Sequence, residues 1–253
     1  MTGVTADDNL WLRRFHRTPT RSPGDPRLVC LPHAGGSASS FLSFSRSLAA
    51  VLEVVAVQYP GRQERRREPC FGSIAELADQ VFRVLKPLTD RPLALFGHSM
   101  GAIAAFEVAR RLEDAAGVSL VALFVSGRRA PSRYRAECVH QKDDDGIVAE
   151  IKELSGTDTR VLDDEELLRM VLPAIRSDYA AIETYRYQDG AKLHCPIHAL
   201  VGAADPRATI EEVAAWEEYT TGQFTISVFP GGHFYLNEQQ GDIAEAVATH
   251  LAC

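Results

Sequence analysis

The sequence predicts an α/β fold in which a mostly parallel sheet carries helices on both faces. Short apolar segments of strand length alternate with longer amphipathic segments from residue 28 to the end of the chain. Strands that alternate with helices usually pair in parallel, because each helix returns the chain across one face of the sheet. A second observation is the Gly-His-Ser-Met-Gly turn at 97–101, which lies between a strand-like and a helix-like segment.

The first half of the chain predicts three strands, each followed by a helix. The helix after the second strand has a defined start, because Ser73 and Glu76 form the S-x-x-E pattern of a capping box. Its apolar residues recur at the i, i+3, i+4 spacing of one helix face. The expected elements are a strand at 28–31, a helix near 40–51, a strand at 54–58, a helix over 74–85, a strand at 93–96 and a helix over 102–112.

The second half predicts three more strands and one long interruption. The expected elements are a strand at 120–125, the interruption over 127–193, a strand at 196–201, a helix over 210–219, a strand at 224–229 and a helix at 242–251. The interruption has no strand signal, but its apolar residues between Leu168 and Ile182 keep a helical spacing. Pro173 falls within that stretch and is expected to kink or split the helix.

The interruption leaves one strand and returns to the next, so helices inserted there would cover the carboxyl edge of the sheet. We therefore expect a mobile helical lid at about 128–190, within a single domain that spans 1–253. The alternative is that the inserted helices only add packing away from the site.

The turn at 97–101 has the form of a nucleophile elbow, the G-x-S-x-G turn of the α/β-hydrolase fold. Gly97 and Gly101 lack a Cβ, so the strand and the helix can approach each other closely around Ser99. The serine Oγ is then exposed above the sheet edge, at the N-terminus of a helix. Ser99 is therefore the candidate nucleophile, and the alternative is a glycine-rich turn with an incidental serine.

A serine becomes a strong nucleophile when a neighbouring base takes its proton. In this fold the acid and then the histidine follow the serine along the chain. Asp205 and His233 each come directly after a predicted strand, at the edge where parallel α/β sheets place their sites. They are the candidate acid and base, although Asp205 could instead close an Asx-turn and His233 could be an ordinary loop histidine. The ring of His98 is expected to project sideways and to miss the Oγ of Ser99.

Acyl transfer also needs N–H groups that stabilise the developing oxyanion. The first expected donor is the N–H of Met100, the residue after the nucleophile, and the second comes from the loop after an early strand. The loop at 32–37 follows the strand at 28–31 and contains two glycines. We assign the second donor to Ala34, with Gly35 in reserve; the alternative is a purely structural glycine turn.

The composition restricts the class of protein. The 253 residues are 45% hydrophobic and 24% charged, which is ordinary for a globular domain. The net charge of −7 argues against nucleic-acid binding, and no apolar stretch has the length of a transmembrane helix. No histidine has a second ligand at metal spacing, so we expect neither a metal nor another cofactor. The five cysteines lack C-x-x-C spacing and the N-terminus lacks a secretory signal, which predicts free thiols in the cytoplasm.

Three segments besides the elbow carry a specific resemblance. They are Leu31-Pro32-His33-Ala34-Gly35-Gly36-Ser37, Tyr59-Pro60-Gly61-Arg62 and Gly232-His233-Phe234-Tyr235-Leu236. Over nearly its whole length the chain resembles the free-standing type II thioesterases of polyketide and nonribosomal peptide assembly lines. One departure is Gly232, where members of that family often carry an acidic residue. The resemblance implies a serine thioesterase that removes stalled or aberrant acyl groups from the phosphopantetheine arm of acyl or peptidyl carrier domains.

The resemblance also implies a basic docking surface, because carrier domains are acidic around the pantetheine serine. Two arginine clusters follow predicted strand ends: Arg62, Arg65, Arg66 and Arg67, and Arg128, Arg129, Arg133 and Arg135. The second cluster is the preferred candidate, because it leads into the expected lid. The alternative is that both clusters are ordinary solvated loop charges.

The residues alone leave other functions open. A generic carboxylesterase or lipase, or an acyltransferase, would use the same Ser99-Asp205-His233 set. A non-catalytic binding protein on this fold would lack one member of the set, and all three are present in this chain.

Overall fold

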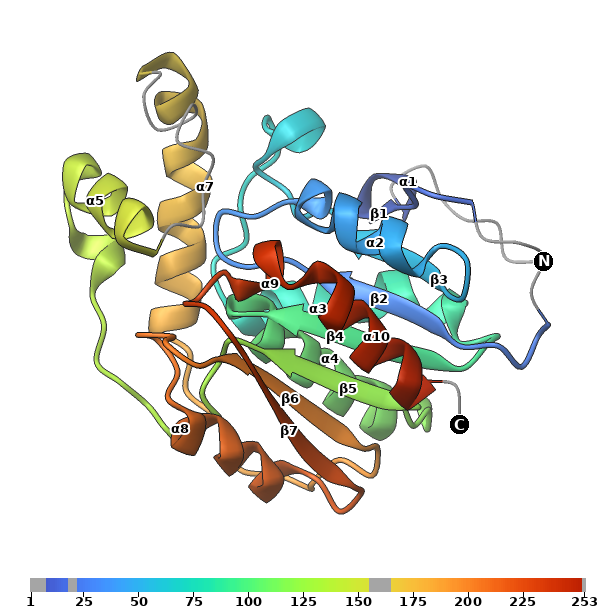
Figure 1. Ribbon diagram of the computed structural model, residues 1–253. Coiled ribbons are helices and arrows are strands. Elements are labelled where there is room, and N and C mark those ends of the chain that lie inside the picture. Colours follow the sequence, from blue (N-terminus) through green and yellow to red (C-terminus); the bar gives the residue numbers. More distant parts are fainter. Residues whose placement is uncertain (1–7, 18–21, 155–164, 252–253) are drawn as a thin grey trace.

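The computed structural model describes residues 8–17, 22–154 and 165–251, which form a seven-stranded sheet covered by helices (Figure 1). The strand order is β1-β3-β2-β4-β5-β6-β7, and every neighbouring pair is parallel except β1 with β3. The predicted α/β class with a mostly parallel sheet is therefore confirmed. The strands are β1 (Leu12–Arg13), β2 (Arg27–Leu31), β3 (Glu53–Val57), β4 (Leu93–His98), β5 (Ala122–Ser126), β6 (Ile197–Gly202) and β7 (Phe224–Phe229).

The central strands are hydrophobic along their whole length because helices cover both faces of the sheet. Every residue of β2, β4, β5 and β6 is buried, as expected for strands of a parallel sheet. The edge strand β7 stays partly exposed. The sequence did not predict β1, because a strand of two residues carries no periodic signal.

Two helical layers enclose the sheet (Figure 1). On one face α3 (Ile74–Leu85) packs beside α4 (Met100–Ala116), and on the other α2 (Leu42–Leu48) packs beside α10 (Gln240–Leu251). Successive strand residues point to opposite faces, so Val29 belongs to the core under α3 and α4 and Cys30 to the core under α2 and α10. The shorter elements are α1 (Asp8–Trp11), α8 (Ile210–Ala214), α9 (Tyr235–Glu238), and the 3-10 turns η1 (Ala38–Phe41), η2 (Gln63–Arg65), η3 (Lys86–Leu88), η4 (Val139–Gln141) and η5 (Ala215–Tyr219).

Some helix boundaries differ from the prediction because local hydrogen bonds decide them. The expected helix near 40–51 begins as the 3-10 turn η1 and ends at Leu48, and the expected helix over 210–219 divides into α8 and η5. At the start of α3 the Ser73 side chain accepts the N–H of Glu76 at 3.1 Å. The Glu76 carboxylate, however, accepts the N–H of Gly72 at 2.7 Å rather than that of Ser73. The capping interaction thus reaches one residue further back than the predicted box.

The long interruption contains α5 (Asp144–Leu154) and α7 (Glu165–Glu183), which stand beyond the carboxyl ends of the strands (Figure 1). The two helices share a small hydrophobic cluster of their own, which is separate from the cores of the sheet. Its buried members are Val139, Ile147, Ile151, Leu172 and Ile175. Part of the interruption, 155–164, lies outside the described residues.

The expectation that Pro173 splits the inserted helix is wrong. Helix α7 continues through Pro173 from Glu165 to Glu183. Proline removes one main-chain donor, but Leu172 and Ala174 on either side of it are buried, and this packing holds the helix together. In the described ranges, no helix combines the length and the apolar character that a membrane span requires.

Candidate active site

The turn between β4 and α4 holds Ser99 in a strained conformation. Ser99 has φ 54° and ψ −117°; Gln63 is the other non-glycine residue with positive φ in the described part of the chain. Such a conformation costs on the order of 1–3 kcal/mol and persists only where the surroundings impose it. A Cβ on Gly97 would lie 2.1 Å from the carbonyl oxygen of Gly101, and a Cβ on Gly101 would lie 2.1 Å from that of Leu31. The close approach of strand, helix and loop therefore requires both glycines.

The structure brings Ser99, Asp205 and His233 together in one hydrogen-bonded chain. His233 Nε2 lies 3.0 Å from Ser99 Oγ, and His233 Nδ1 lies 2.9 Å from Asp205 Oδ2. Asp205 follows β6 and His233 follows β7, and these strands are neighbours in parallel register. Because a carboxylate only accepts, Nδ1 carries the proton toward Asp205 and Nε2 is left to accept from the serine. The arrangement is a serine–histidine–aspartate triad.

Asp205 both closes an Asx-turn and bonds to His233, so the two alternatives for this residue hold together. Its Oδ1 accepts the N–H of Arg207 at 2.8 Å, which is an Asx-turn. The Asp205 side chain also lies within bonding distance of His233 through both oxygens. Both side chains are almost fully buried, so water competes little for the interaction. The turn orients the carboxylate that the histidine uses.

The candidate oxyanion donors lie beside the serine. Met100 is the first residue of α4, and Ala34 lies in the loop after β2. Both line the same small cavity as Ser99 and His233. Within the described residues, neither N–H has a hydrogen-bond partner of its own. The reserve assignment to Gly35 is wrong, because the Gly35 N–H donates to Asp178 Oδ2 at 2.7 Å and is not available to a substrate.

The cavity at Ser99 is enclosed by the inserted helices as well as by the sheet loops. It is small, about 40 Å³, and partly open to solvent. Its walls include Leu154 of α5 and Tyr179, Ile182 and Glu183 of α7. His33 separates it from a larger groove of about 930 Å³, which runs between the loop at 33–40 and the helix α7.

A buried chain of polar side chains lies beside His233. His98 Nδ1 lies 2.9 Å from Ser126 Oγ, which lies 2.6 Å from Tyr235 Oη. The His98 ring packs against that of His233 with 5.3 Å between centroids. Burial holds the pKa of His98 well below its ordinary value, so this ring is neutral and adds no charge beside His233. The sequence predicted that His98 misses Ser99, but it gave no signal for the partners Ser126 and Tyr235.

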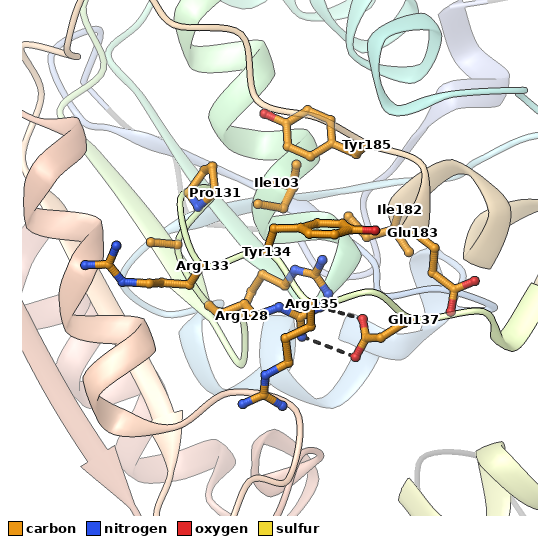
Figure 2. Close-up of a pocket in the computed structure, with 12 residues that line it drawn as sticks. Ile103, Arg128, Pro131, Arg133, Tyr134, Arg135, Glu137, Ile182, Glu183 and Tyr185 are labelled. Atoms are coloured by element: carbon orange, nitrogen blue, oxygen red, sulfur yellow. Dashed lines mark hydrogen bonds and ion pairs between the residues drawn. The ribbon is translucent and has the colours of Figure 1, made fainter.

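Most arginines of the predicted docking clusters are buried or ion-paired. Arg62 and Arg65 are buried, and Arg129 is buried in an ion pair with Glu137. Arg133 and Arg135 pair with Glu218 and Glu212 on the neighbouring strand–helix unit. Arg128 lines the Ser99 cavity, and burial lowers its pKa to about 9. Figure 2 shows Arg128, Arg133 and Arg135 with Glu137 and Glu183 around an adjoining small pocket.

The cluster at 128–135 therefore offers a partner few unpaired charges, and its role in docking stays a prediction. The partners Glu212 and Glu218 lie far along the chain and could not be identified from the local sequence, whereas Glu137 lies close to the cluster. Arg66 and Arg67 of the other cluster remain exposed.

Comparisons with known proteins agree with the geometry. A family model for the thioesterase domain matches residues 26–251. Thioesterase PikA5 of Streptomyces venezuelae is 53% identical over 249 residues, which cover 98% of this chain and 88% of that protein. The structure of the type II thioesterase BorB from the borrelidin biosynthetic cluster has a TM-score of 0.88 at 53% identity, covering 96% of this chain and 98% of that one.

A more distant relative has the same architecture. RedJ, a thioesterase of the prodiginine pathway in Streptomyces coelicolor, has a TM-score of 0.84 at 37% identity and covers 92% of this chain and 90% of its own. The similarity to these thioesterases thus extends over nearly the full length of each aligned chain. The chain belongs to the thioesterase family, as a type II thioesterase of the α/β-hydrolase fold.

Proposed function

We propose that the protein hydrolyses acyl groups from the phosphopantetheine arm of acyl or peptidyl carrier proteins, and so removes stalled or aberrant units from a polyketide or nonribosomal peptide assembly line. The observation that carries the proposal is the position of His233 between Ser99 and Asp205, in a chain 53% identical to a type II thioesterase of known structure. The relatedness to thioesterases of such pathways supports the carrier substrate, and the geometry of the site supports the hydrolytic chemistry.

The proposed reaction begins when His233 Nε2 accepts the Ser99 proton as Oγ attacks the thioester carbonyl. Asp205 accepts from Nδ1–H, which fixes the tautomer and stabilises the imidazolium. The carbon–sulfur bond then breaks, and His233 returns the proton to the leaving pantetheine thiolate. In the second half His233 deprotonates a water that attacks the acyl-serine, which releases a carboxylic acid and regenerates Ser99.

Met100 and Ala34 are the proposed oxyanion donors for both tetrahedral intermediates. Both residues line the same cavity as Ser99, and their N–H groups have no hydrogen-bond partner among the described residues. Backbone donors fixed in a water-poor site stabilise the oxyanion strongly because they need no reorganisation during the reaction. No step of this scheme draws on a metal or an organic cofactor.

We expect the proposed activity to depend on the carrier and not only on the acyl group. The test is turnover of one acyl chain presented as an acyl-carrier thioester, as an acyl-N-acetylcysteamine thioester and as a small oxygen ester. A type II thioesterase should favour the carrier thioester. A generic carboxylesterase would prefer the oxygen ester, and an acyltransferase would transfer the acyl group to an added alcohol or amine instead of to water.

The exposed arginines of the first cluster are the remaining candidates for carrier docking. Arg66 lines the 930 Å³ groove, and Arg67 is exposed beside it. Rim charges chiefly change the association rate and its salt dependence. Reversing both to glutamate should lower kcat/KM for an acyl-carrier protein about tenfold at low salt. The small thioester should react as before.

The control for this charge reversal is Arg83→Glu. Arg83 is exposed in the last turn of α3, toward the amino edge of the sheet and away from the groove. Arg83→Glu should leave kcat/KM unchanged for both the carrier thioester and the small thioester. Equal losses for the carrier and the small thioester in the double variant would show that Arg66 and Arg67 do not form the docking surface.

We also propose that α5 and the first half of α7 act as a lid within a single domain. Leu154 of α5 forms part of the wall of the Ser99 cavity, and Met170 and Val171 in the first half of α7 line the adjoining groove, so movement of these segments would widen the path of an acyl chain to Ser99. The second half of α7 is anchored, because Ser177 Oγ donates to the Phe71 carbonyl at 2.9 Å and Ile182 joins the core of the sheet. The mobile part is therefore narrower than the predicted 128–190.

Hydrogen exchange should resolve these two halves. Amides in 144–154 and 165–172 should exchange faster than those in 176–183, and both faster than β4. Covalent modification of Ser99 by a long-chain acyl phosphonate should change exchange in the first two segments and leave β4 unchanged. Uniform protection across the insertion and β4, with no response to the inhibitor, would refute the lid.

The cytoplasm is the compartment that the cysteines favour. Cys30, Cys70, Cys138 and Cys195 are free thiols, which suits a reducing environment. The fifth cysteine, Cys253, lies outside the described residues.

A further inference from the structure

The loop that carries Ala34 is held by a buried carboxylate on the inserted helix α7. Asp178 has no exposed surface, and its Oδ2 accepts the Gly35 N–H at 2.7 Å. The same oxygen accepts Nη1 of Arg62 at 2.7 Å, and Oδ1 accepts Nη2 at 2.9 Å. One side chain of the insertion therefore bonds both to the peptide next to the proposed oxyanion donor and to the arginine of the Tyr-Pro-Gly-Arg segment.

Arg62 also bonds to the loop that carries Ala34. Its Nη1 also donates to the Gly36 carbonyl at 2.9 Å, and its Nε donates to the Pro60 carbonyl at 3.1 Å. Burial alone would lower the pKa of Arg62. The neighbouring Asp178 carboxylate raises it by a larger amount, so the pKa of Arg62 lies above its ordinary value. A bidentate arginine–carboxylate pair of this kind is directional as well as strong.

The peptide between Ala34 and Gly35 is fixed at both ends. Its N–H, on Gly35, donates to Asp178, and its carbonyl, on Ala34, accepts from His33 Nδ1 at 2.9 Å. A peptide group is planar, so two opposed hydrogen bonds determine its orientation. Gly35 has φ +74°, which lets the chain turn away directly after this peptide. The N–H of Ala34 itself has no partner among the described residues, and Ala34 lines the Ser99 cavity.

We propose that Asp178 is a positioning residue for the oxyanion hole. By fixing the Ala34–Gly35 peptide, it holds the Ala34 N–H toward the oxygen that becomes negative during acyl transfer. Because Asp178 belongs to α7, the inserted helices and the oxyanion hole are mechanically linked. The inference rests on the proposed function, in which Ala34 is one of the two oxyanion donors.

Two substitutions separate positioning from simple ion pairing. Asp178→Asn keeps a side-chain oxygen for the Gly35 N–H but loses the charge that faces Arg62. Asp178→Ala loses both. Removing one oxyanion donor typically costs about 10²–10³-fold in kcat, so Asp178→Ala should lower kcat about 10²-fold while KM for a small acyl thioester changes little. Asp178→Asn should recover most of that loss.

The control is a partly buried ion pair at the opposite edge of the sheet. Glu53 Oε2 pairs with Arg91 Nη1 at 2.8 Å, and Glu53 opens β3. Glu53→Gln should leave kcat at the wild-type value. If Asp178→Ala does not fold, the double variant Arg62→Gln, Asp178→Ala replaces it, because that variant leaves no unpaired buried charge.

The experiment measures kcat and KM together with amide hydrogen exchange at residues 33–37. The proposal predicts a loss of kcat and of protection at Gly35 in Asp178→Ala, with both largely restored in Asp178→Asn. Equal losses in the two variants, or a wild-type kcat in Asp178→Ala, would overturn it. A wild-type protein without thioester turnover would refute the proposed function instead, and the exchange data would still decide whether Asp178 fixes the loop.

Discussion

Replacing Ser99 with alanine is expected to lower kcat for acyl thioesters by roughly 10⁴-fold or more. Ser99 Oγ is 3.0 Å from His233 Nε2, so its loss removes the atom that bonds to the acyl group. The triad acts as a unit, and the remaining groups contribute only binding and oxyanion stabilisation. A fluorophosphonate probe, which reacts with activated serines, should label the wild-type protein and not this variant.

The fold should survive the substitution. Ser99 Oγ has no hydrogen-bond partner besides His233 among the described residues, so alanine leaves no buried donor unsatisfied. The matched control is Ser47→Ala on the exposed side of α2, which should change neither labelling nor kcat. Labelling that persists in folded Ser99→Ala would show that another residue is the nucleophile.

The second large effect is expected from Gly97→Ala, which should destabilise the protein by about 3 kcal/mol or more. The added Cβ would lie 2.1 Å from the Gly101 carbonyl oxygen and 2.5 Å from the Ala102 nitrogen. Both are backbone atoms, so α4 itself must move away from β4 and carry Ser99 with it. For a chain of this length the midpoint of thermal unfolding should fall by about 10 °C, and residual activity should be low.

A glycine without neighbours serves as the control for this substitution. A Cβ on Gly24 would meet nothing within 4 Å, so Gly24→Ala should change the free energy of unfolding by less than about 0.5 kcal/mol. Calorimetry of both variants makes the comparison. An unchanged unfolding temperature in Gly97→Ala would mean that strand and helix are not in the close contact that the elbow requires.

The sequence predicted best those features that depend on residues close together in the chain. Strands β2, β4, β5 and β6 are buried along their length and read as apolar runs. The elbow glycines, Asp205 and His233 each occupy turns that directly follow such strands. Parallel strands end at one edge of the sheet, so chain order alone predicted that Ser99, Asp205 and His233 would lie together.

The parts that the sequence missed depend on contacts between distant segments. Asp178 lies in the middle of an amphipathic helical stretch, and nothing in that stretch indicates that it bonds to Gly35 and Arg62. The arginines at 128–135 looked available because their partners, such as Glu212, lie about 80 residues further along the chain. The sequence predicts a kink or a split at Pro173, but α7 runs through this residue and packs against α5.

The central claim is that Ser99 takes the acyl group from a carrier-bound thioester and passes it to water. The most direct measurement is mass spectrometry of both partners after the protein is mixed with an acyl-loaded carrier protein. We expect the carrier to return to its free phosphopantetheine form, the free acid to accumulate, and a transient acyl adduct on the peptide that contains Ser99. A carrier that keeps its acyl group, or that loses it without dependence on Ser99, would contradict the account.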